Sequence, residues 1–484
     1  MKRFCVIALA ALMLLGCFAR AEENGELNVY LKSLGERRTI HLTVAGEYAI
    51  GGEALCEGTT LALRAENGGV RVSDGAVSVQ AGRSVRLQRG ASGGLYIAES
   101  GKNARYDGSL TVSARGNRLR CVLEIGVEDY LCGVVGYEMS DSFPLEALKA
   151  QAVAARTYAM RAKARGRELV DTAGDQVYKG RNDAYQNVLR AVEETRGVVG
   201  TVGDRFAECY YTASNGGMIA TPEEIWGGTS DGAIEAHEDP YDLENPRSLV
   251  SSVSFRANLA DCAKLRKLLG AKLNGKEPLG VLNARVDGRT AVFALLARSE
   301  ARSECALTAY SIETVELDAY DDLKRGLAIG LNRRDCERIS ICRIDGGFAI
   351  EMRGFGHCAG MSQRGAQQMA GAYGKSYREI LAFYYPNMAL ETLEWAETSP
   401  LAVEDPARAI VALKHADSHW NLRTAPDENA AIIGRTGNGR KRRNARDRCA
   451  YHVRIRIWSG VRQGKNQSED ERKCALCGCA CWAL

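Results

Sequence analysis

The hydrophobic pattern of the chain changes its period near residue 126, and this change constrains the fold more than any other feature. From about residue 27 to 125, short runs such as LNVYL, IHLTV and SLTVSA are separated by glycine-rich turns, which is typical of β-strands. Beyond residue 126 the apolar residues recur three and four positions apart, as in amphipathic helices. We therefore predict an α+β protein, with a strand-rich N-terminal scaffold over residues 25–125 and a helix-rich part over residues 126–395.

Three helices are predicted at the start of the helix-rich part. The first is VEDYLCGVVGYEMS, and the second begins at Pro144, because proline suits the first turn of a helix. The third, AYQNVLRAVEETR, can be capped by Asp183. Residues 250–350 then alternate strands with short helices, and Ser362 and a capping box at Ser376 predict two further helix starts.

The first of these helices carries a carboxylate on its apolar stripe. The stripe consists of Val127, Tyr130, Leu131, Val134 and Val135, and its next positions are Glu138 and Met139. Burial of a carboxylate without a partner disfavours its charged form, so its pKa is expected to rise. A carboxylic acid that stays protonated near neutral pH can act as a general acid. The alternative is that the helix ends here and Glu138 turns into solvent or pairs with an arginine.

The first residues have the architecture of an export signal. Two basic residues precede an apolar run from about Val6 to Leu15, and small residues follow. We favour a signal peptide over residues 1–21, while the sequence LLGC resembles a lipoprotein box that would anchor the chain at Cys17. An uncleaved membrane anchor is a third reading, although the run is short for a span. We therefore expect a protein that works beyond the cytoplasmic membrane, associated with the cell envelope or secreted.

Charge and cysteine content exclude some classes of protein. The 64 basic and 60 acidic residues are nearly balanced, so nothing global indicates nucleic-acid binding. The 16 cysteines are widely scattered and do not form the dense framework of a disulfide-rich domain. Most are expected to be buried as small apolar residues, and a bridge between Cys336 and Cys342 stays open.

The C-terminal end changes character at Gly439. Residues 408–439 read like the opening of a small β-barrel module that is incomplete, and residues 440–484 are rich in arginine and cysteine without a structural pattern. We predict that this tail is poorly ordered, as an out-of-frame product would be. A zinc site is the alternative reading, although a second, separated ligand pair is missing. Its ligands would be Cys474, Cys477, Cys479 and Cys481, with Cys449 or His452.

Three separated segments together resemble the stage II sporulation protein D family, which acts on peptidoglycan. They are VEDYLCGVVGYEMSDSFPLEALKAQAVAARTYAM; then QVYKG with YYTASNGGMIATPEEIWGG and EDPYDLENP; and GFGHCAGMSQRGAQQMAGAYGKSYREILAFYYPN. They occur in the family's order and extend over residues 25–395. The segment NLRTAP also resembles the start of a bacterial SH3-like wall-binding module.

The resemblance implies a lytic transglycosylase that cuts glycan strands with a single catalytic glutamate, which matches Glu138 here. It also implies a set of glycan contacts around this acid, whose amides, hydroxyls and imidazole suit sugar hydroxyl and acetamido groups. We expect these contacts from Gln151, Arg156, Tyr211, Ser214, His357, Ser362 and Gln363.

Each predicted contact has a structural alternative. Arg156 can neutralise Glu138, Gln151 can be a solvated helix residue, and His357 can brace the glycine loop. Trp226 is expected to pack in the protein instead of forming a sugar platform. We expect no metal or other cofactor, because the residues before QVYKG lack the cysteine and histidine cluster with which some family members bind zinc.

Some relatives act differently, as enhancers of wall amidases. The alternative function is therefore a non-catalytic, wall-binding enhancer of an N-acetylmuramoyl-L-alanine amidase. In either case the expected partner is the peptidoglycan glycan strand, and in the second case an amidase as well.

Overall fold

The computed structural model describes residues 25–100, 104–299, 308–332, 335–394, 420–423 and 432–436. The chain divides into two compact units. The first contains the segments up to Glu138 and Ala162–Gln186, and the second contains Met139–Arg161 and Asn187–Leu393. The first unit thus extends beyond residue 125 and includes the first predicted helix.

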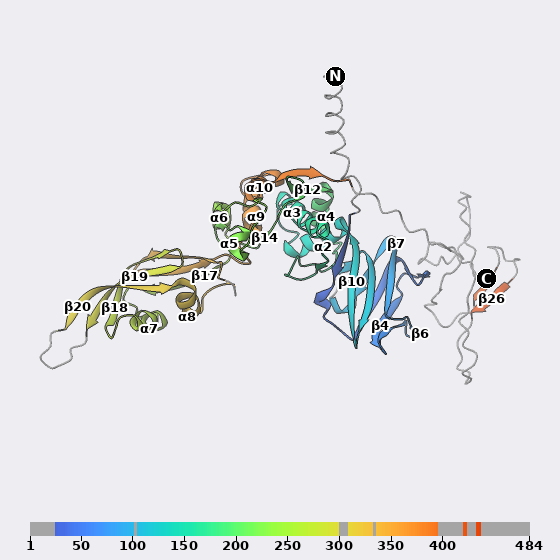
Figure 1. Ribbon diagram of the computed structural model, residues 1–484, viewed down its shortest axis with the longest axis horizontal. Coiled ribbons are helices and arrows are strands. Elements are labelled where there is room, and N and C mark those ends of the chain that lie inside the picture. The colour runs from blue at the N-terminus through green and yellow to red at the C-terminus, as the bar shows by residue number, and fades with distance from the viewer. Residues whose placement is uncertain are drawn as a thin grey trace, which may run out of the picture. The chain divides into compact units, whose positions relative to one another are not determined.

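The first unit is built on one large, mainly antiparallel sheet (Figure 1, blue to cyan). The strands follow the order β11-β1-β10-β9-β7-β2-β4-β5-β6, and β3 and β8 pair with β2 and β7. Their bounds are β1 (Glu26–Tyr30), β2 (Thr39–Ile50), β3 (Glu53–Leu55), β4 (Thr60–Glu66), β5 (Gly69–Ser73), β6 (Ser78–Gln80), β7 (Ser84–Ile97), β8 (Arg105–Tyr106), β9 (Ser109–Arg115), β10 (Arg118–Gly126) and β11 (Leu169–Val170).

Alternating side chains of these strands form the core of the first unit. In β10, for example, Leu119, Cys121, Leu123 and Ile125 are buried, while the residues between them are half-buried. This period of two is the pattern of a sheet that has one face packed on a core. Helix α2 (Val127–Glu138) follows β10 directly. Short 3₁₀ turns lie at η1 (Lys32–Leu34) and η2 (Ala98–Ser100).

The second unit contains the remaining helices and several small sheets. Helix α3 (Leu145–Ala164) begins directly after Pro144, and its alanines, except Ala164 at its end, are almost completely buried, which allows close packing. Outside residues 250–353, the other helices are α4 (Gln186–Glu194), α5 (Pro222–Trp226), α6 (Pro240–Glu244), α9 (Gln363–Gly371) and α10 (Tyr377–Tyr384). The short strands are β12 (Val198–Val202), β13 (Arg205–Phe206), β14 (Tyr211–Thr212), β15 (Met218–Ile219), β16 (His237–Glu238), β23 (Met361–Ser362) and β24 (Ala389–Thr392).

Residues 250–353 of this unit have a hydrophobic cluster of their own, which includes Phe255, Leu265, Phe293 and Ile350. Two three-stranded antiparallel sheets enclose it, in the orders β17-β22-β21 and β18-β19-β20. The elements are β17 (Val250–Arg256), α7 (Ala263–Ala271), β18 (Glu277–Asp287), β19 (Thr290–Ser299), β20 (Ala309–Asp318), η3 (Ala319–Lys324), α8 (Arg325–Leu327), β21 (Arg338–Ile344) and β22 (Gly347–Arg353).

The α+β class predicted from the sequence is confirmed, and so are most helix starts. The Ser362 hydroxyl accepts from the Gly365 amide at the start of α9, and Ser376 forms a capping box with Glu379 at α10. The prediction that Asp183 caps the third helix is wrong, because its carboxylate instead pairs with Arg105 and Arg181. A backbone amide in the first turn of α4 instead donates to an acceptor from another segment.

That segment is the turn after α2. The Asp141 Oδ1 accepts from the Val188 amide at 2.8 Å, which supplies the missing cap of α4. The signal peptide, Cys17 and the tail 440–484 with its cysteines lie outside the described residues. Within residues 408–439, strands β25 (Trp420–Arg423) and β26 (Ile432–Thr436) form an antiparallel hairpin.

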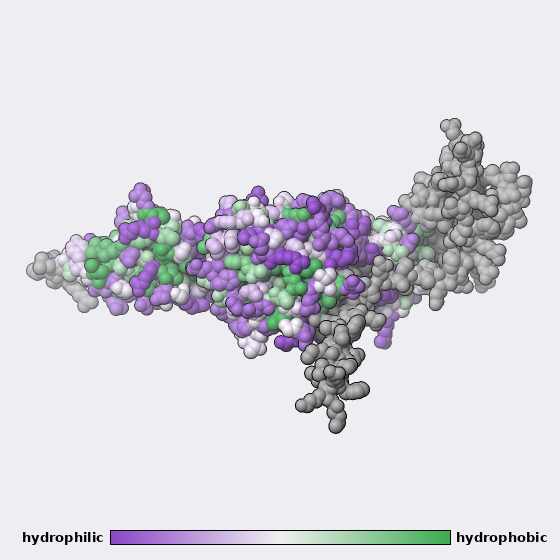
Figure 2. All heavy atoms as spheres, turned by 90° about the horizontal axis from the view of Figure 1, so that it is seen from above, coloured by the Kyte–Doolittle hydropathy of each residue, from purple (hydrophilic) through white to green (hydrophobic). Residues whose placement is uncertain are grey.

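On the face that Figure 2 shows, the surface of the described residues is mainly hydrophilic, with several separate hydrophobic patches. None of the described helices has the length and apolar character that a membrane span requires.

Candidate functional site

Glu138 is the last residue of α2, and its side chain is half-buried. The apolar stripe that precedes it is buried as predicted, since none of its five members is more than 1% exposed. Met139, the next position, is also 1% exposed. The carboxylate therefore stands at the point where a fully buried helix face reaches the protein surface.

The QVYKG segment, residues 176–180, holds this carboxylate in place. The backbone amide of Val177 donates to Glu138 Oε1 at 3.1 Å. One residue earlier, the buried side chain of Gln176 accepts a hydrogen bond from the Tyr130 hydroxyl at 3.3 Å. The QVYKG segment is therefore joined to α2 by two hydrogen bonds, although the two are separate in the sequence. One of these bonds orients the predicted acid.

Tyr178 locks this segment onto the helix. Its ring stacks on Tyr130 with centroids 5.1 Å apart and meets Tyr106 edge-on at 5.6 Å. The helix leaves room for the ring only because residue 133 is glycine: a Cβ there would lie 2.5 Å from the Tyr178 ring. The position of Val177, and with it the orientation of Glu138, therefore depends on close packing at Gly133.

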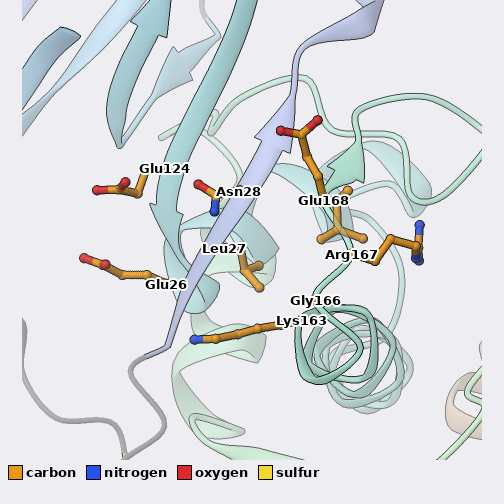
Figure 3. Close-up of a pocket in the computed structure, with 9 residues that line it drawn as sticks. Glu26, Leu27, Asn28, Glu124, Lys163, Gly166, Arg167 and Glu168 are labelled. Atoms are coloured by element: carbon orange, nitrogen blue, oxygen red, sulfur yellow. The ribbon is translucent and has the colours of Figure 1, made fainter.

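A pocket of about 350 Å³ in the first unit does not include Glu138. It lies between the start of β1, the end of β10 and the turn after α3 (Figure 3). Its lining is largely charged, with Glu26, Glu124, Lys163, Arg167 and Glu168. Two of these acids pair with arginines of the sheet, Glu124 with Arg86 and Glu168 with Arg120. This pattern is typical of a solvated, ion-paired surface.

In the second unit, residues 211–220 and 355–362 are joined by strand pairing and backbone hydrogen bonds, and they carry a second group of polar residues. Strand β14 pairs in parallel with β23, so that Tyr211 lies opposite Met361. Ser214 and Phe355 exchange backbone hydrogen bonds of 3.1 and 2.8 Å. The Ala220 amide donates to the carbonyl of Cys358 at 3.1 Å. The structure thus brings the predicted residues of 211–214 and 357–363 together.

Two buried carboxylates organise this region. Asp242 accepts hydrogen bonds from the hydroxyls of Ser214 and Ser362, at 2.8 and 2.7 Å. Asp239 caps α6 and accepts from the Asn215 amide at 2.8 Å and the Tyr384 hydroxyl at 2.7 Å. Burial raises the pKa of the Asp239 carboxyl above its usual range. Because these bonds join four separate segments, the pair fixes the geometry of the loops around it.

Three more of the predicted contacts are also buried. Arg156 is completely enclosed, and its guanidinium donates to the carbonyls of Val198 at 3.1 Å and Val192 at 3.3 Å. Gln151 is equally buried and accepts from the Gln363 amide at 3.5 Å. Its own Nε2 has no hydrogen-bond partner in the described part of the protein. These side chains tie α3 to its neighbours.

His357 and Tyr211 are more accessible, since both are half-buried. The Ala359 amide donates to His357 Nδ1 at 3.1 Å, so a neutral imidazole carries its proton on Nε2. The adjacent Cys358 has a φ of +63°, a left-handed conformation that is rare for a residue with a side chain. Thr212 holds this strained turn by accepting from the Cys358 amide at 3.3 Å. The His357 loop is therefore rigidly positioned.

Comparison with known proteins identifies the family. A model of the stage II sporulation protein family, SpoIID, matches residues 115–201. An uncharacterized protein of Brachyspira hyodysenteriae is 30% identical over 292 residues, which cover 58% of this chain and 70% of that protein. The chain belongs to the stage II sporulation protein D family.

Two relatives of this family member come from Bacillus subtilis. Stage II sporulation protein D is 27% identical over 325 residues, which cover 63% of this chain and 86% of that protein. A protein named amidase enhancer is 30% identical over 290 residues, which cover 54% of this chain and 40% of the enhancer. The family match at 115–201 includes α2 with Glu138, α3 with Gln151 and Arg156, and the QVYKG segment.

The sequence interpretation did not single out Asp239, Asp242 and Tyr384 of this family member. The signal was present in EDPYDLENP, where an aspartate followed by proline is a typical helix start. Of the eight predicted site residues, Glu138 lies in the first compact unit and the other seven lie in the second. No group of three or more metal-ligating side chains is arranged to hold an ion within the described ranges.

Proposed function

We propose that this SpoIID-family protein is exported and cleaves the glycan strands of peptidoglycan by lytic transglycosylation, with Glu138 as its single acid–base catalyst. The observation that carries the proposal is a half-buried carboxylate at the end of a buried helix face, with one oxygen bound to the Val177 amide. A general acid must be held in one orientation to deliver a proton to a defined atom. Family membership supports a role at the cell wall.

In the proposed reaction, protonated Glu138 donates its proton to the oxygen that joins muramic acid to glucosamine. The bond from this oxygen to C1 of the muramic acid breaks, and positive charge develops on the sugar ring. The hydroxyl on C6 of the same muramic acid then attacks C1 and passes its proton to the Glu138 carboxylate. One glycosidic bond is exchanged for an internal anhydro ring, no water is consumed, and the acid is regenerated.

The surroundings of the other acids support a mechanism with one carboxylate. A hydrolase of the usual kind needs a second carboxylate to activate water or attack the sugar. Asp141, the nearest acid in the sequence, accepts from the Val188 amide and caps α4. Asp239 and Asp242 are 0% and 1% exposed, and other side chains occupy their oxygens.

For the second unit we propose a division of labour. Tyr211 and His357, which are half-buried, contact the glycan directly, and the Nε2 proton of His357 is suited to a sugar hydroxyl or acetamido oxygen. The five buried residues, Gln151, Arg156, Ser214, Ser362 and Gln363, act as positioning residues that hold the loops in place.

A second candidate function follows from the similarity to the Bacillus subtilis amidase enhancer. In that case the protein binds the wall and stimulates an N-acetylmuramoyl-L-alanine amidase without cutting glycan. One set of variants separates the two functions. If the enzyme proposal is correct, wild type cuts purified glycan strands, E138Q does not, and E138Q keeps the melting temperature of the wild type.

The matched control for E138Q is D141N, which changes a nearby carboxylate that caps a helix. We expect D141N to keep a melting temperature close to that of the wild type, because the asparagine oxygen can still accept from the Val188 amide, and to cut glycan. An enhancer would give a different result: wild type and both variants would leave glycan intact, and both wild type and E138Q would stimulate the amidase. Full cleavage by E138Q would refute the role of Glu138.

A further inference from the structure

An aromatic cluster lies on the surface of the second unit beside His357. Trp226, at the end of α5, is 44% exposed. Its ring centroid is 5.1 Å from that of His357 and 4.8 Å from that of Tyr210. Tyr158 of α3 extends the cluster, with its centroid 6.0 Å from that of Tyr210. We define these four residues as the aromatic platform.

The platform is held rigidly. Helix α5 starts with a capping box between Thr221 and Glu224, and the Glu223 carboxylate accepts from the Ser230 amide at 2.8 Å. The carbonyl of Tyr210 accepts from the Tyr385 hydroxyl at 2.7 Å and from the Met361 amide at 3.1 Å. A rigid aromatic surface loses little conformational entropy when a ligand binds.

The surface next to Trp226 is open. The two residues that follow it, Gly227 and Gly228, have φ angles of +73° and +84°, and a Cβ at either would meet no atom within 4 Å. Phe355, two residues before His357, is also 42% exposed. Single exposed aromatic residues are common, but several rings in contact around a polar imidazole form an amphipathic surface, and tryptophan and tyrosine are enriched at binding surfaces of this kind.

We propose that the aromatic platform is a saccharide subsite that binds one N-acetylated sugar ring of a glycan strand. A pyranose ring has one face rich in C–H groups and an edge of hydroxyl and acetamido groups. The C–H groups carry a small positive charge, which the negative face of an aromatic ring attracts. The imidazole of His357 places a polar group beside the rings, where the polar edge of the sugar would lie.

This inference rests on the proposed function, because it names a binding site for the same glycan. It goes further in assigning Trp226 the largest part of the contact. The competing occupant for such a surface is an extended peptide, such as a peptidoglycan stem, since aromatic grooves also bind extended chains. The small size of the cluster favours a single sugar ring, because protein partners usually require a larger continuous apolar patch.

The test measures binding without cleavage. Full-length E138Q is titrated calorimetrically with stem-free glycan strands. The same titration is made with three double variants, in which E138Q is combined with W226A, W226F or Y310A. Tyr310 is the control because it is 63% exposed on β20, outside the platform. We expect W226A to weaken binding roughly tenfold and W226F to retain most of the affinity, as an aromatic contact would. Y310A should bind like E138Q alone.

Each other outcome is informative. Equal glycan affinity of E138Q and E138Q/W226A overturns the saccharide subsite. A loss of affinity in E138Q/Y310A as large as that in E138Q/W226A also overturns it. Binding of isolated stem peptides in place of glycan identifies the peptide as the occupant and also overturns it. If W226A weakens glycan binding but the wild type cuts no glycan, the saccharide subsite is supported. Only the transglycosylase proposal is then refuted.

Discussion

The packing of Gly133 against Tyr178 gives a quantitative prediction for the link between fold and catalysis. In G133A, the new Cβ would lie 2.5 Å from Tyr178 Cε2, 2.7 Å from Cδ2 and 3.0 Å from the backbone carbon of Gly180. Ordinary carbon contacts lie at about 3.5 Å or more, so the ring must move by about 1 Å. Tyr178 is fully buried between Tyr106 and Tyr130, which leaves it no simple path.

The expected magnitude follows from two opposing effects. Overpacking of a core costs about 1–3 kcal/mol. The gain in helix propensity from glycine to alanine returns about 1 kcal/mol. The net loss in the free energy of unfolding is therefore about 0–2 kcal/mol, which corresponds to a melting temperature lower by up to roughly 8 °C. Displacement of Tyr178 also shifts the adjacent Val177 amide away from Glu138, so glycan cleavage should slow as well.

Thermal unfolding and a cleavage assay on G133A measure both effects. The matched control is G126A, at the end of β10, where a Cβ meets no atom within 4 Å. Its stability should stay within about 0.5 kcal/mol of the wild type. In a double-mutant cycle, most of the cost of G133A should disappear in a Y178A background, where the 3.0 Å contact with Gly180 remains. If G133A is as stable and as active as G126A, the proposed dependence of Glu138 on this contact is wrong.

Three further predictions concern the second unit and the tail. The hydrogen bond from Lys375, together with the cap at Ser376, lowers the pKa of Glu379 from 4.5 to about 2. This contribution to stability is present above pH 4.5 and is lost as the pH falls towards 2, so the melting temperature of E379Q should be lower at neutral pH and converge with the wild type in that range. S362A should lower the free energy of unfolding by about 2 kcal/mol, because it removes a bond to the Asp242 carboxylate and the cap of α9; a raised KM at unchanged stability would instead assign Ser362 to the glycan. Truncation after Gly439 should leave cleavage and melting temperature unchanged, and stoichiometric zinc in the full-length protein would contradict this.

The helix periodicity and the local caps were readable from the sequence because both depend on residues a few positions apart. The stripe that ends at Glu138 is an example, since the period of 3.6 defines the buried face whatever the face packs against. Ser362 and Ser376 are others, because a capping side chain bonds an amide within its own first turn.

Contacts between distant segments could not be predicted in the same way. Asp183 precedes α4 and has the right chemistry for a cap, but Arg105 and Arg181 compete for its carboxylate. The cap comes instead from Asp141, which lies 47 residues before Val188. In the same way, the carboxylates of Asp239 and Asp242 resemble surface residues until the fold surrounds them with hydroxyl and amide donors.

The platform at Trp226 illustrates a different limit. Tryptophan side chains are highly buried on average, so the sequence alone favours a packing role for Trp226. Its exposure depends on the short capped helix that carries it and on the two glycines that follow. These features are local, but His357, whose ring lies beside Trp226, is more than 100 residues away in the sequence.

The most direct test of the central proposal is to identify the oxygen at the new glycan ends. Purified glycan strands are incubated with the wild-type protein in water enriched in ¹⁸O, and the products are analysed by mass spectrometry. If Glu138 drives internal attack by the muramic acid hydroxyl, the products carry anhydro-muramoyl ends without ¹⁸O, and E138Q yields none of them. Reducing ends that contain ¹⁸O would show that water is the nucleophile and would contradict the transglycosylase mechanism.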